Sequence, residues 1–271
     1  DFMVAYLKKI GATHLFGIPG DLVLKLFLQF ARPRGFRIVT LSHEPGVGFA
    51  ADAYARASGR IGVVCVTYGA GGFNILNPVA GSFSEKVPIL VVSGGPGEDE
   101  RKLGQLIHHQ AKEIESQFRM FDEITCAARV IDDPERAARN IDEVIRAIWM
   151  NRRPGYLEIH RDMVDAMIPV PKDIRDWKGD LPGAQSDNRK VIEAARETVT
   201  TTVLGKGAFP MDHPLHMGVH VGPISPPKIR RRVDDADLVI NLGTLLTDMN
   251  LGSQPPQITR DKSIWAVNNK V

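Results

Sequence analysis

The sequence has few cysteines, little net charge and no long apolar run. Its two cysteines, Cys65 and Cys126, show no CxxC spacing, which argues against a structural zinc site and a disulfide framework. A net charge of +2 argues against the concentrated basic surface of a dedicated nucleic-acid-binding protein. No stretch reaches the roughly 18 apolar residues of a membrane span, and no signal segment opens the chain. We therefore expect a reducing, cytoplasmic setting, with no nucleic-acid or membrane partner.

Familiar phosphate-binding and nucleophile signatures are absent as well. The sequence contains no GxxxxGKS/T phosphate loop and no GxSxG nucleophile elbow. The run Gly69–Asn74 follows an apolar strand and precedes a helix, as a dinucleotide fingerprint would, but its sixth position is Asn74. The next strand also ends without the acid that binds a ribose. A glycine turn that lets the backbone approach a ligand or a helix is the better interpretation.

What the sequence does contain is an alternation of helices with short, almost wholly apolar strands. This pattern predicts a parallel sheet covered on both faces, that is, a doubly wound α/β domain. We expect that domain over residues 1–171 and a linker over 172–187, because the latter segment is rich in proline and charge. The expected strands are 14–18, 36–41, 61–67, 89–93 and 155–159, and the expected helices are 2–10, 22–31, 46–58, 73–85, 105–120 and 134–150, with a loop over 94–103.

The second region, residues 188–271, carries a thinner α/β pattern. Three strands are expected there, which is half of a doubly wound unit, so we interpret it as an incomplete Rossmann-like domain. The expected helices are 190–197 and 227–233, and the expected strands are 198–204, 238–242 and 263–267.

Glu44 stands where an apolar strand gives way to a helix. Ligands of open α/β sheets bind beyond the carboxyl ends of the strands, so this carboxylate is placed for chemistry. Pro45 follows it and suits a first helical turn, where a carboxylate also complements the helix dipole. Asp21 precedes a helix in the same way and has helix capping as its simpler interpretation. The local sequence leaves both alternatives open.

His108 and His109 are neighbours in the sequence. Adjacent side chains diverge by about 100° on a helix and lie on opposite faces of a strand, so one metal ion does not easily take both. Imidazoles change charge near neutral pH and can bond separate groups there. A surface or structural role is the alternative.

A series of short motifs nevertheless occurs in a recognisable order. Together they resemble the pyrimidine-binding N-terminal domain of thiamine-diphosphate-dependent 2-oxo acid decarboxylases, and most of all the phenylpyruvate and indolepyruvate decarboxylase branch. The resemblance covers residues 2–171. The motifs are Gly17-Ile18-Pro19-Gly20-Asp21, Ser42-His43-Glu44-Pro45, Thr67-Tyr68-Gly69-Ala70-Gly71, Glu85-Lys86-Val87-Pro88, Gly94-Gly95-Pro96-Gly97 and Leu106-Ile107-His108-His109-Gln110.

The resemblance implies a chemical role for the motif residues. Glu44 would hydrogen-bond the N1′ atom of the aminopyrimidine, as a carboxyl kept protonated by an apolar setting to which Val47, Phe49, Ala50 and Ala51 would contribute. The cofactor would supply the electron sink for loss of carbon dioxide from a 2-oxo acid, and an aldehyde would leave. The implied proton relay is Asp21, His108 and His109, and the implied contacts with cofactor or substrate are Glu44, Pro19, Gly20, Thr67, Gly69, Gly71 and Asn74.

The resemblance also implies parts that this sequence lacks. The diphosphate and its Mg²⁺ are expected in a C-terminal domain with a Gly-Asp-Gly…Asn signature, so no metal ligand is assigned here. The segments 200–210 and 236–242 resemble the middle domain, but a strand and a helix expected between Ala194 and Val199 are missing. A deletion, a proteolysed form or an omitted segment would each explain that. Asp1 stands directly before an expected helix and Val271 lies shortly after an expected strand, so we expect a fragment that is not competent alone.

Three functional hypotheses follow from the resemblance. Decarboxylation is favoured by Asp21 and the paired histidines, in active sites formed between subunits of a homodimer or homotetramer. Acetolactate-synthase-like carboligases share the fold and the glutamate and are the first alternative. A remnant that binds without catalysis is the second.

Overall fold

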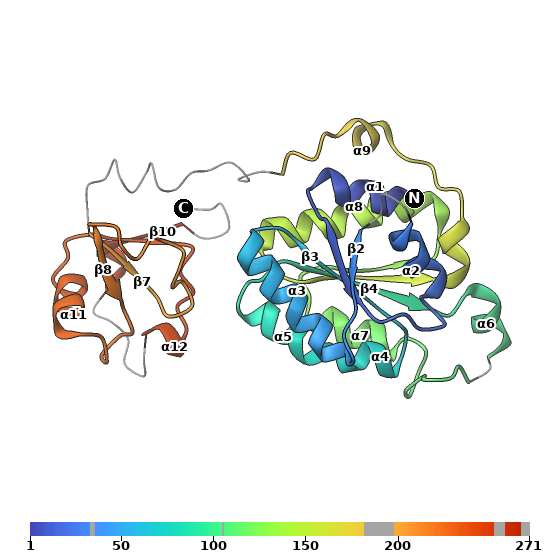
Figure 1. The fold of residues 1–271 in the computed structure, drawn as a ribbon, viewed down its shortest axis with the longest axis horizontal. Coiled ribbons are helices and arrows are strands. Elements are labelled where there is room, and N and C mark those ends of the chain that lie inside the picture. The colour runs from blue at the N-terminus through green and yellow to red at the C-terminus, as the bar shows by residue number, and fades with distance from the viewer. Residues whose placement is uncertain (33–35, 105, 182–197, 252–257, 267–271) are drawn as a thin grey trace. The chain divides into compact units, whose positions relative to one another are not determined.

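The computed structural model describes residues 1–32, 36–104, 106–181, 198–251 and 258–266 (Figure 1). The chain divides into two compact units, Asp1–Leu181 and Pro182–Val271. The helix expected over 190–197 lies outside the described residues, as does most of the segment between Ala194 and Val199 where elements were expected to be missing.

The first unit is built on a six-stranded sheet in which every pair of neighbouring strands is parallel. Helices connect the strands, which confirms the predicted doubly wound fold. The strand order is β2 (Arg37–Val39), β1 (His14–Gly17), β3 (Gly62–Val66), β4 (Ile89–Gly95), β6 (Gly155–His160) and β5 (Ala128–Ile131). The helices are α1 (Phe2–Lys9), α2 (Leu24–Ala31), α3 (Glu44–Ser58), α4 (Ala70–Asn74), α5 (Leu76–Ser84), α6 (Glu98–Leu103), α7 (Ser116–Glu123), α8 (Pro134–Asn151), η1 (Arg161–Asp165) and α9 (Lys172–Asp176).

Both faces of the sheet are covered, and β3 shows why its sequence is apolar throughout. Successive side chains of a strand point to opposite faces. Val63 and Cys65 pack into the core shared with α1, α2 and α8. Val64 and Val66 pack into the core shared with α3 and α5. Figure 1 shows α1 and α8 on one side of the sheet and α3 and α5 on the other.

The segment between β4 and α7 differs from the prediction. The loop expected over 94–103 contains α6, which lacks buried residues and so has no apolar periodicity to reveal it. Its acidic first turn and basic last turn complement the helix dipole. The helix expected over 105–120 begins only at Ser116, since described residues before it form turns and His109 has a φ of 66°. The helix expected over 73–85 is in fact two helices, α4 and α5, that meet at Ile75.

The second unit contains four described strands where three were expected. β7 (Val199–Thr201) pairs with β8 (His216–Val219) and β9 (Val239–Leu242) pairs with β10 (Ser263–Ala266), both in parallel. The prediction missed β8 because its sequence His-Met-Gly-Val is only four residues long and contains a glycine, a residue depleted in strands. The helices are α11 (Pro227–Asp234), α12 (Asp248–Leu251) and η2 (Arg260–Lys262). Among the helices described in either unit, none has the length and apolar character needed to cross a membrane.

Candidate active site

The carboxyl edge of the sheet brings three of the predicted loops together. From β1 the chain continues to β2 on one side and then crosses to β3 on the other side, which makes the boundary between β1 and β3 a topological switch point. Gly20 and Asp21 follow β1, and Thr67 follows β3. Glu44 opens α3 after β2, the strand that flanks β1. These residues therefore lie where open α/β sheets bind their ligands.

Glu44 is the first residue of α3 and is half-buried. Its carboxylate oxygen Oε2 accepts a hydrogen bond of 3.1 Å from Nδ2 of Asn74, the last residue of α4. Among the residues that the structure describes, no other group hydrogen-bonds this carboxylate. The second oxygen, Oε1, is thus available to a ligand, while Asn74 holds the first.

Thr67 lies between two glycines, Gly20 and Gly71, and a side chain at either position would collide with it. A Cβ atom on Gly71 would come within 2.8 Å of Thr67 Cγ2 and 3.4 Å of Glu44 Oε1, and one on Gly20 would also collide with Thr67. The Thr67 hydroxyl Oγ1 is buried, and no partner for it exists in the described part of the chain. Buried hydroxyls normally have a hydrogen-bond partner. An orphaned hydroxyl beside a free carboxylate oxygen fits a small polar ring such as the aminopyrimidine of thiamine diphosphate.

Asp21 pairs with the first of the two histidines. His108 Nε2 lies 2.8 Å from Asp21 Oδ2, and both side chains are about half exposed. Asp21 does not cap α2, because the N-cap position belongs to Val23 and no side chain bonds there. The capping interpretation of Asp21 is therefore wrong.

His109 approaches the glycine turn through its backbone. Its ring lies edge-on to that of His108, with centroids 4.9 Å apart. Its left-handed backbone faces Gly69, which also has a positive φ, of 74°. A Cβ atom on Gly69 would overlap the His109 carbonyl oxygen. Glycine is required at position 69 both for its conformation and for this contact.

The predicted residues thus form two adjoining groups. One comprises Glu44, Asn74, Thr67, Gly20 and Gly71, and the other comprises Asp21, His108, His109 and Gly69. Pro19 lies exposed in the turn that carries Gly20 and Asp21.

The apolar setting expected around Glu44 is only partly present. Val47 and Ala51 are buried, but they belong to the core between α3 and the sheet. Phe49 is 54% exposed, so it closes no apolar pocket in the described part of the chain.

A buried polar network lies beneath the glycine turn and was not predicted. Gln117 Nε2 donates to Ser93 Oγ at 2.9 Å and to Tyr156 Oη at 2.7 Å, and the Tyr156 hydroxyl donates to Glu158 Oε2 at 2.9 Å. Burial raises the pKa values of both Tyr156 and Glu158. The carboxylate within the apolar strand 155–159 is a signal that could have revealed this network, whereas Gln117 gives none.

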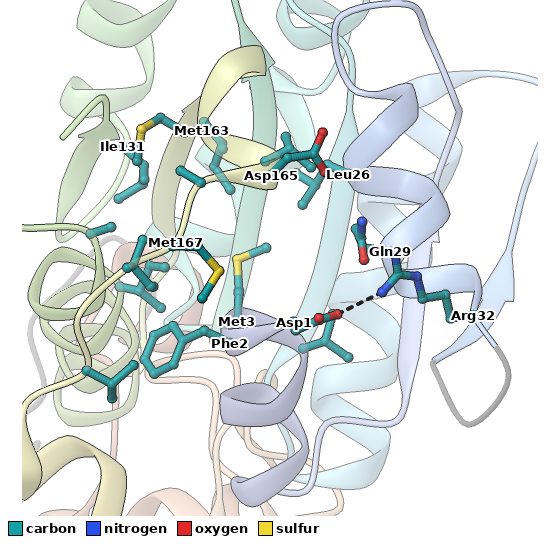
Figure 2. A pocket seen from close by; sticks show the side chains of 18 residues that line it. Asp1, Phe2, Met3, Leu26, Gln29, Arg32, Ile131, Met163, Asp165 and Met167 are labelled. Atoms are coloured by element: carbon teal, nitrogen blue, oxygen red, sulfur yellow. Dashed lines mark hydrogen bonds and ion pairs between the residues drawn. The ribbon is translucent and has the colours of Figure 1, made fainter. Parts of the chain in front are cut away.

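The cavity shown in Figure 2 is separate from these groups. It has a volume of about 400 Å³ and is lined mainly by apolar side chains of α1, α2, α8, η1 and the segment 166–170. The polar groups labelled there include Gln29 and the ion pair of Arg32 with Asp1, whose Nη1 and Oδ1 atoms lie 3.0 Å apart. None of the predicted site residues lines this cavity. The described residues also contain no group of three or more His, Cys, Asp or Glu side chains arranged to hold a metal ion.

Comparison with known proteins gives two family matches. Residues 1–120 match the N-terminal TPP binding domain of thiamine pyrophosphate enzymes. Residues 176–270 match the central domain of the same enzymes.

Several curated relatives align along almost the whole chain. An indole-3-pyruvate decarboxylase of Azospirillum brasilense is 36% identical over 295 residues, which covers 98% of this chain and 54% of the relative. Pyruvate decarboxylase isozyme 2 of Saccharomyces cerevisiae is 29% identical, covering 93% of this chain and 51% of the relative. A pyruvate decarboxylase of Hanseniaspora uvarum is also 29% identical, covering 91% and 50%. The chain therefore spans about half the length of these relatives.

The two family matches agree with the doubly wound fold and with the gathering of the motif residues at one edge of its sheet. The chain belongs to the thiamine pyrophosphate enzymes, to the family of the 2-oxo acid decarboxylases, and carries their N-terminal and central domains.

Proposed function

We propose that the whole protein catalyses the thiamine-diphosphate-dependent, non-oxidative decarboxylation of an aromatic or bulky 2-oxo acid to an aldehyde. The observation that carries this proposal is the pair of adjoining groups at the switch point, one with Glu44 and one with Asp21 and His108. Release of an aldehyde requires a proton to be delivered to the reaction intermediate, and an acid pair beside the cofactor site can deliver it. A carboligase does not release an aldehyde and has no need of this proton. The preference for an aromatic substrate is supported by the relative named for indole-3-pyruvate.

The residues divide the work according to their geometry. Thiamine diphosphate supplies the electron sink when it is bound. Glu44 holds a proton at the pyrimidine nitrogen through Oε1, while Asn74 fixes the carboxylate through Oε2. Asp21 and His108 exchange a proton between Oδ2 and Nε2 and pass it toward the substrate, with His109 beside them.

The rest of the proposed active site lies outside this chain. The relatives are about twice as long, and we infer that a further part of the protein holds the diphosphate and a Mg²⁺ ion. Glu44, Asp21 and His108 are all at least partly open to solvent here, which suits a site completed by another subunit of a homodimer or homotetramer. We place this activity in the cytoplasm.

Product analysis tests the proposal. The natural protein is incubated with thiamine diphosphate, Mg²⁺ and, in turn, indolepyruvate, phenylpyruvate and pyruvate. We expect the corresponding aldehydes, with the aromatic substrates preferred in kcat/KM. Acetolactate as the main product from pyruvate would instead establish a carboligase.

The mass of the intact natural protein tests the non-catalytic alternative. A chain about twice as long as this one, as in the relatives, supports catalysis. A natural end near Val271 together with no turnover of any of the three acids would establish a remnant.

A further inference from the structure

Gln117 is completely buried, although it is a polar residue on a helix of mostly polar sequence. Its side-chain oxygen Oε1 accepts a hydrogen bond of 2.7 Å from the backbone N–H of Gly69. Its amide nitrogen Nε2 donates to Ser93 Oγ and Tyr156 Oη, and Glu158 Oε2 lies 3.3 Å away. Every polar atom of the side chain therefore has a partner.

These partners allow only one orientation of the amide. The Gly69 N–H is a donor, so it must face the amide oxygen of Gln117. The Glu158 carboxylate accepts hydrogen bonds, and the Tyr156 hydroxyl already donates its own hydrogen to Glu158, so both must face the amide nitrogen. The amide is also enclosed sterically, because a Cβ atom on Gly72 would collide with Gln117 Oε1. A side chain that is both enclosed and fully bonded fixes the position of what it bonds.

What Gln117 bonds is the turn that supports His109. Gly69 takes a φ of 74° and His109 takes a φ of 66°, so two left-handed residues face each other. Their backbones touch so closely that no side chain fits on Gly69. A shift of the Gly69 peptide would therefore move the His109 backbone, and with it the ring that lies against His108.

We propose that Gln117 is a positioning residue of the active site, which holds the Gly69 turn and thereby sets the place of His109. It acts through the backbone and touches neither substrate nor cofactor. The placement of His109 stands on the contacts alone, while its consequence for turnover rests on the proposed decarboxylation.

Hydrogen exchange of the whole natural protein tests the placement without any assay of activity. Gln117→Met keeps the shape of the side chain but removes its hydrogen bonds. We expect faster amide exchange at Gly69 and over residues 106–110. Thr125→Val is the matched control, because it removes another buried hydrogen bond next to α7, from Thr125 Oγ1 to the Phe121 carbonyl at 2.8 Å. Exchange at Gly69 should not change in this control.

Steady-state kinetics test the consequence. A misplacement of about 1 Å can cost about 100-fold in rate, so we expect Gln117→Met to lower kcat by at least about tenfold, with KM less affected. In a His109→Ala background, Gln117→Met should lower kcat by less than about a further twofold. The reason is that the effects of two substitutions do not add when one residue acts through the other.

Two results would overturn the inference: unchanged exchange at Gly69 in Gln117→Met, or a loss of kcat that adds in full to that of His109→Ala. If Gln117→Met does not fold, Gln117→Asn replaces it, because an amide one methylene shorter cannot reach both Gly69 and Tyr156. Unchanged exchange at Gly69 in that variant overturns the inference equally. A wild-type protein without decarboxylase activity would instead contradict the proposed function, and the exchange data would still decide the placement.

Discussion

The Asn74 amide donates to Glu44 Oε2 at 3.1 Å, although 30 positions separate the two residues in the chain. The contact joins the end of α4 to the beginning of α3. It leaves the other carboxylate oxygen facing the glycine turn, where Gly71 gives it room. The carboxylate is thus oriented by a second helix of the same domain, through the last residue of α4.

Glu44→Gln should lower the decarboxylation rate of the whole natural protein by at least about 100-fold, because an amide cannot exchange the proton of a general acid–base group. The measurement is kcat with saturating cofactor. Glu135→Gln is the matched control, since Glu135, like Glu44, lies next to a proline in the first turn of a helix. Near-native turnover in Glu44→Gln would remove the catalytic assignment.

Asn74→Ala should have a smaller effect. A hydrogen bond contributes about 1 kcal/mol, which corresponds to a loss of about fivefold in kcat/KM if Asn74 only orients Glu44. Asn151→Ala serves as the control, because among the described residues the Asn151 amide bonds the Ala147 carbonyl within α8 and no group of the candidate site. A change in kcat/KM as large as that of Glu44→Gln would contradict a purely orienting role.

Asp21→Asn should reduce turnover without loss of stability. The Asp21–His108 pair is about half exposed, and exposed pairs contribute at most about 1 kcal/mol to folding. We expect kcat to fall by at least about tenfold and the melting temperature to change by less than about 4 °C. Asp165→Asn breaks another exposed pair, with Lys25 at 3.1 Å, and should leave both values unchanged. Equal kinetics in the two variants would count against the relay.

Alkaline pH should destabilise the domain through its buried phenols. Burial raises the pKa of Tyr68 to about 12 from an ordinary value of 10.0, so the folded state resists ionisation that the unfolded state allows. This contribution to stability is complete below pH 10 and is lost as the pH rises toward 12. Unfolding followed between pH 9 and 12 should show the decline, with a shallower slope in Tyr68→Phe. An unchanged slope in that variant would contradict the assignment to Tyr68.

Two helical glycines, Gly48 in α3 and Gly81 in α5, should respond in opposite ways to alanine. A Cβ atom on Gly48 would lie 2.5 Å from Pro78 Cγ, where α3 crosses α5, so Gly48→Ala should destabilise the protein by about 1–3 kcal/mol. Gly81 has open space around that position, and Gly81→Ala should stabilise it by about 0.5–1 kcal/mol. Chemical denaturation measures both. Equal changes in the free energy of unfolding would show that α3 and α5 can move apart at Gly48 to accept a side chain.

The sequence itself determined the type of sheet and the residues that end its strands. The apolar run over 61–67 has the length and the β-branched residues of a strand that is buried on both sides, and Val63 and Val64 confirm this prediction by packing into opposite cores. The motifs around Glu44, Asp21 and His108-His109 indicated the family that the comparisons then showed. Such features are readable because periodicity and short motifs are local properties of the chain.

Only the tertiary structure decided how the loops meet. No local pattern shows that Asn74 aims Glu44, that Asp21 pairs with His108 rather than capping α2, or that Gln117 supports the Gly69 turn. The same holds for the segment 106–115, which was expected to be helical but instead forms turns among its described residues, with Ile107 and Ile114 packed against Tyr68 and Leu22. Each of these contacts joins residues that are distant in the sequence, and their geometry depends on the packing of the sheet edge rather than on local preference.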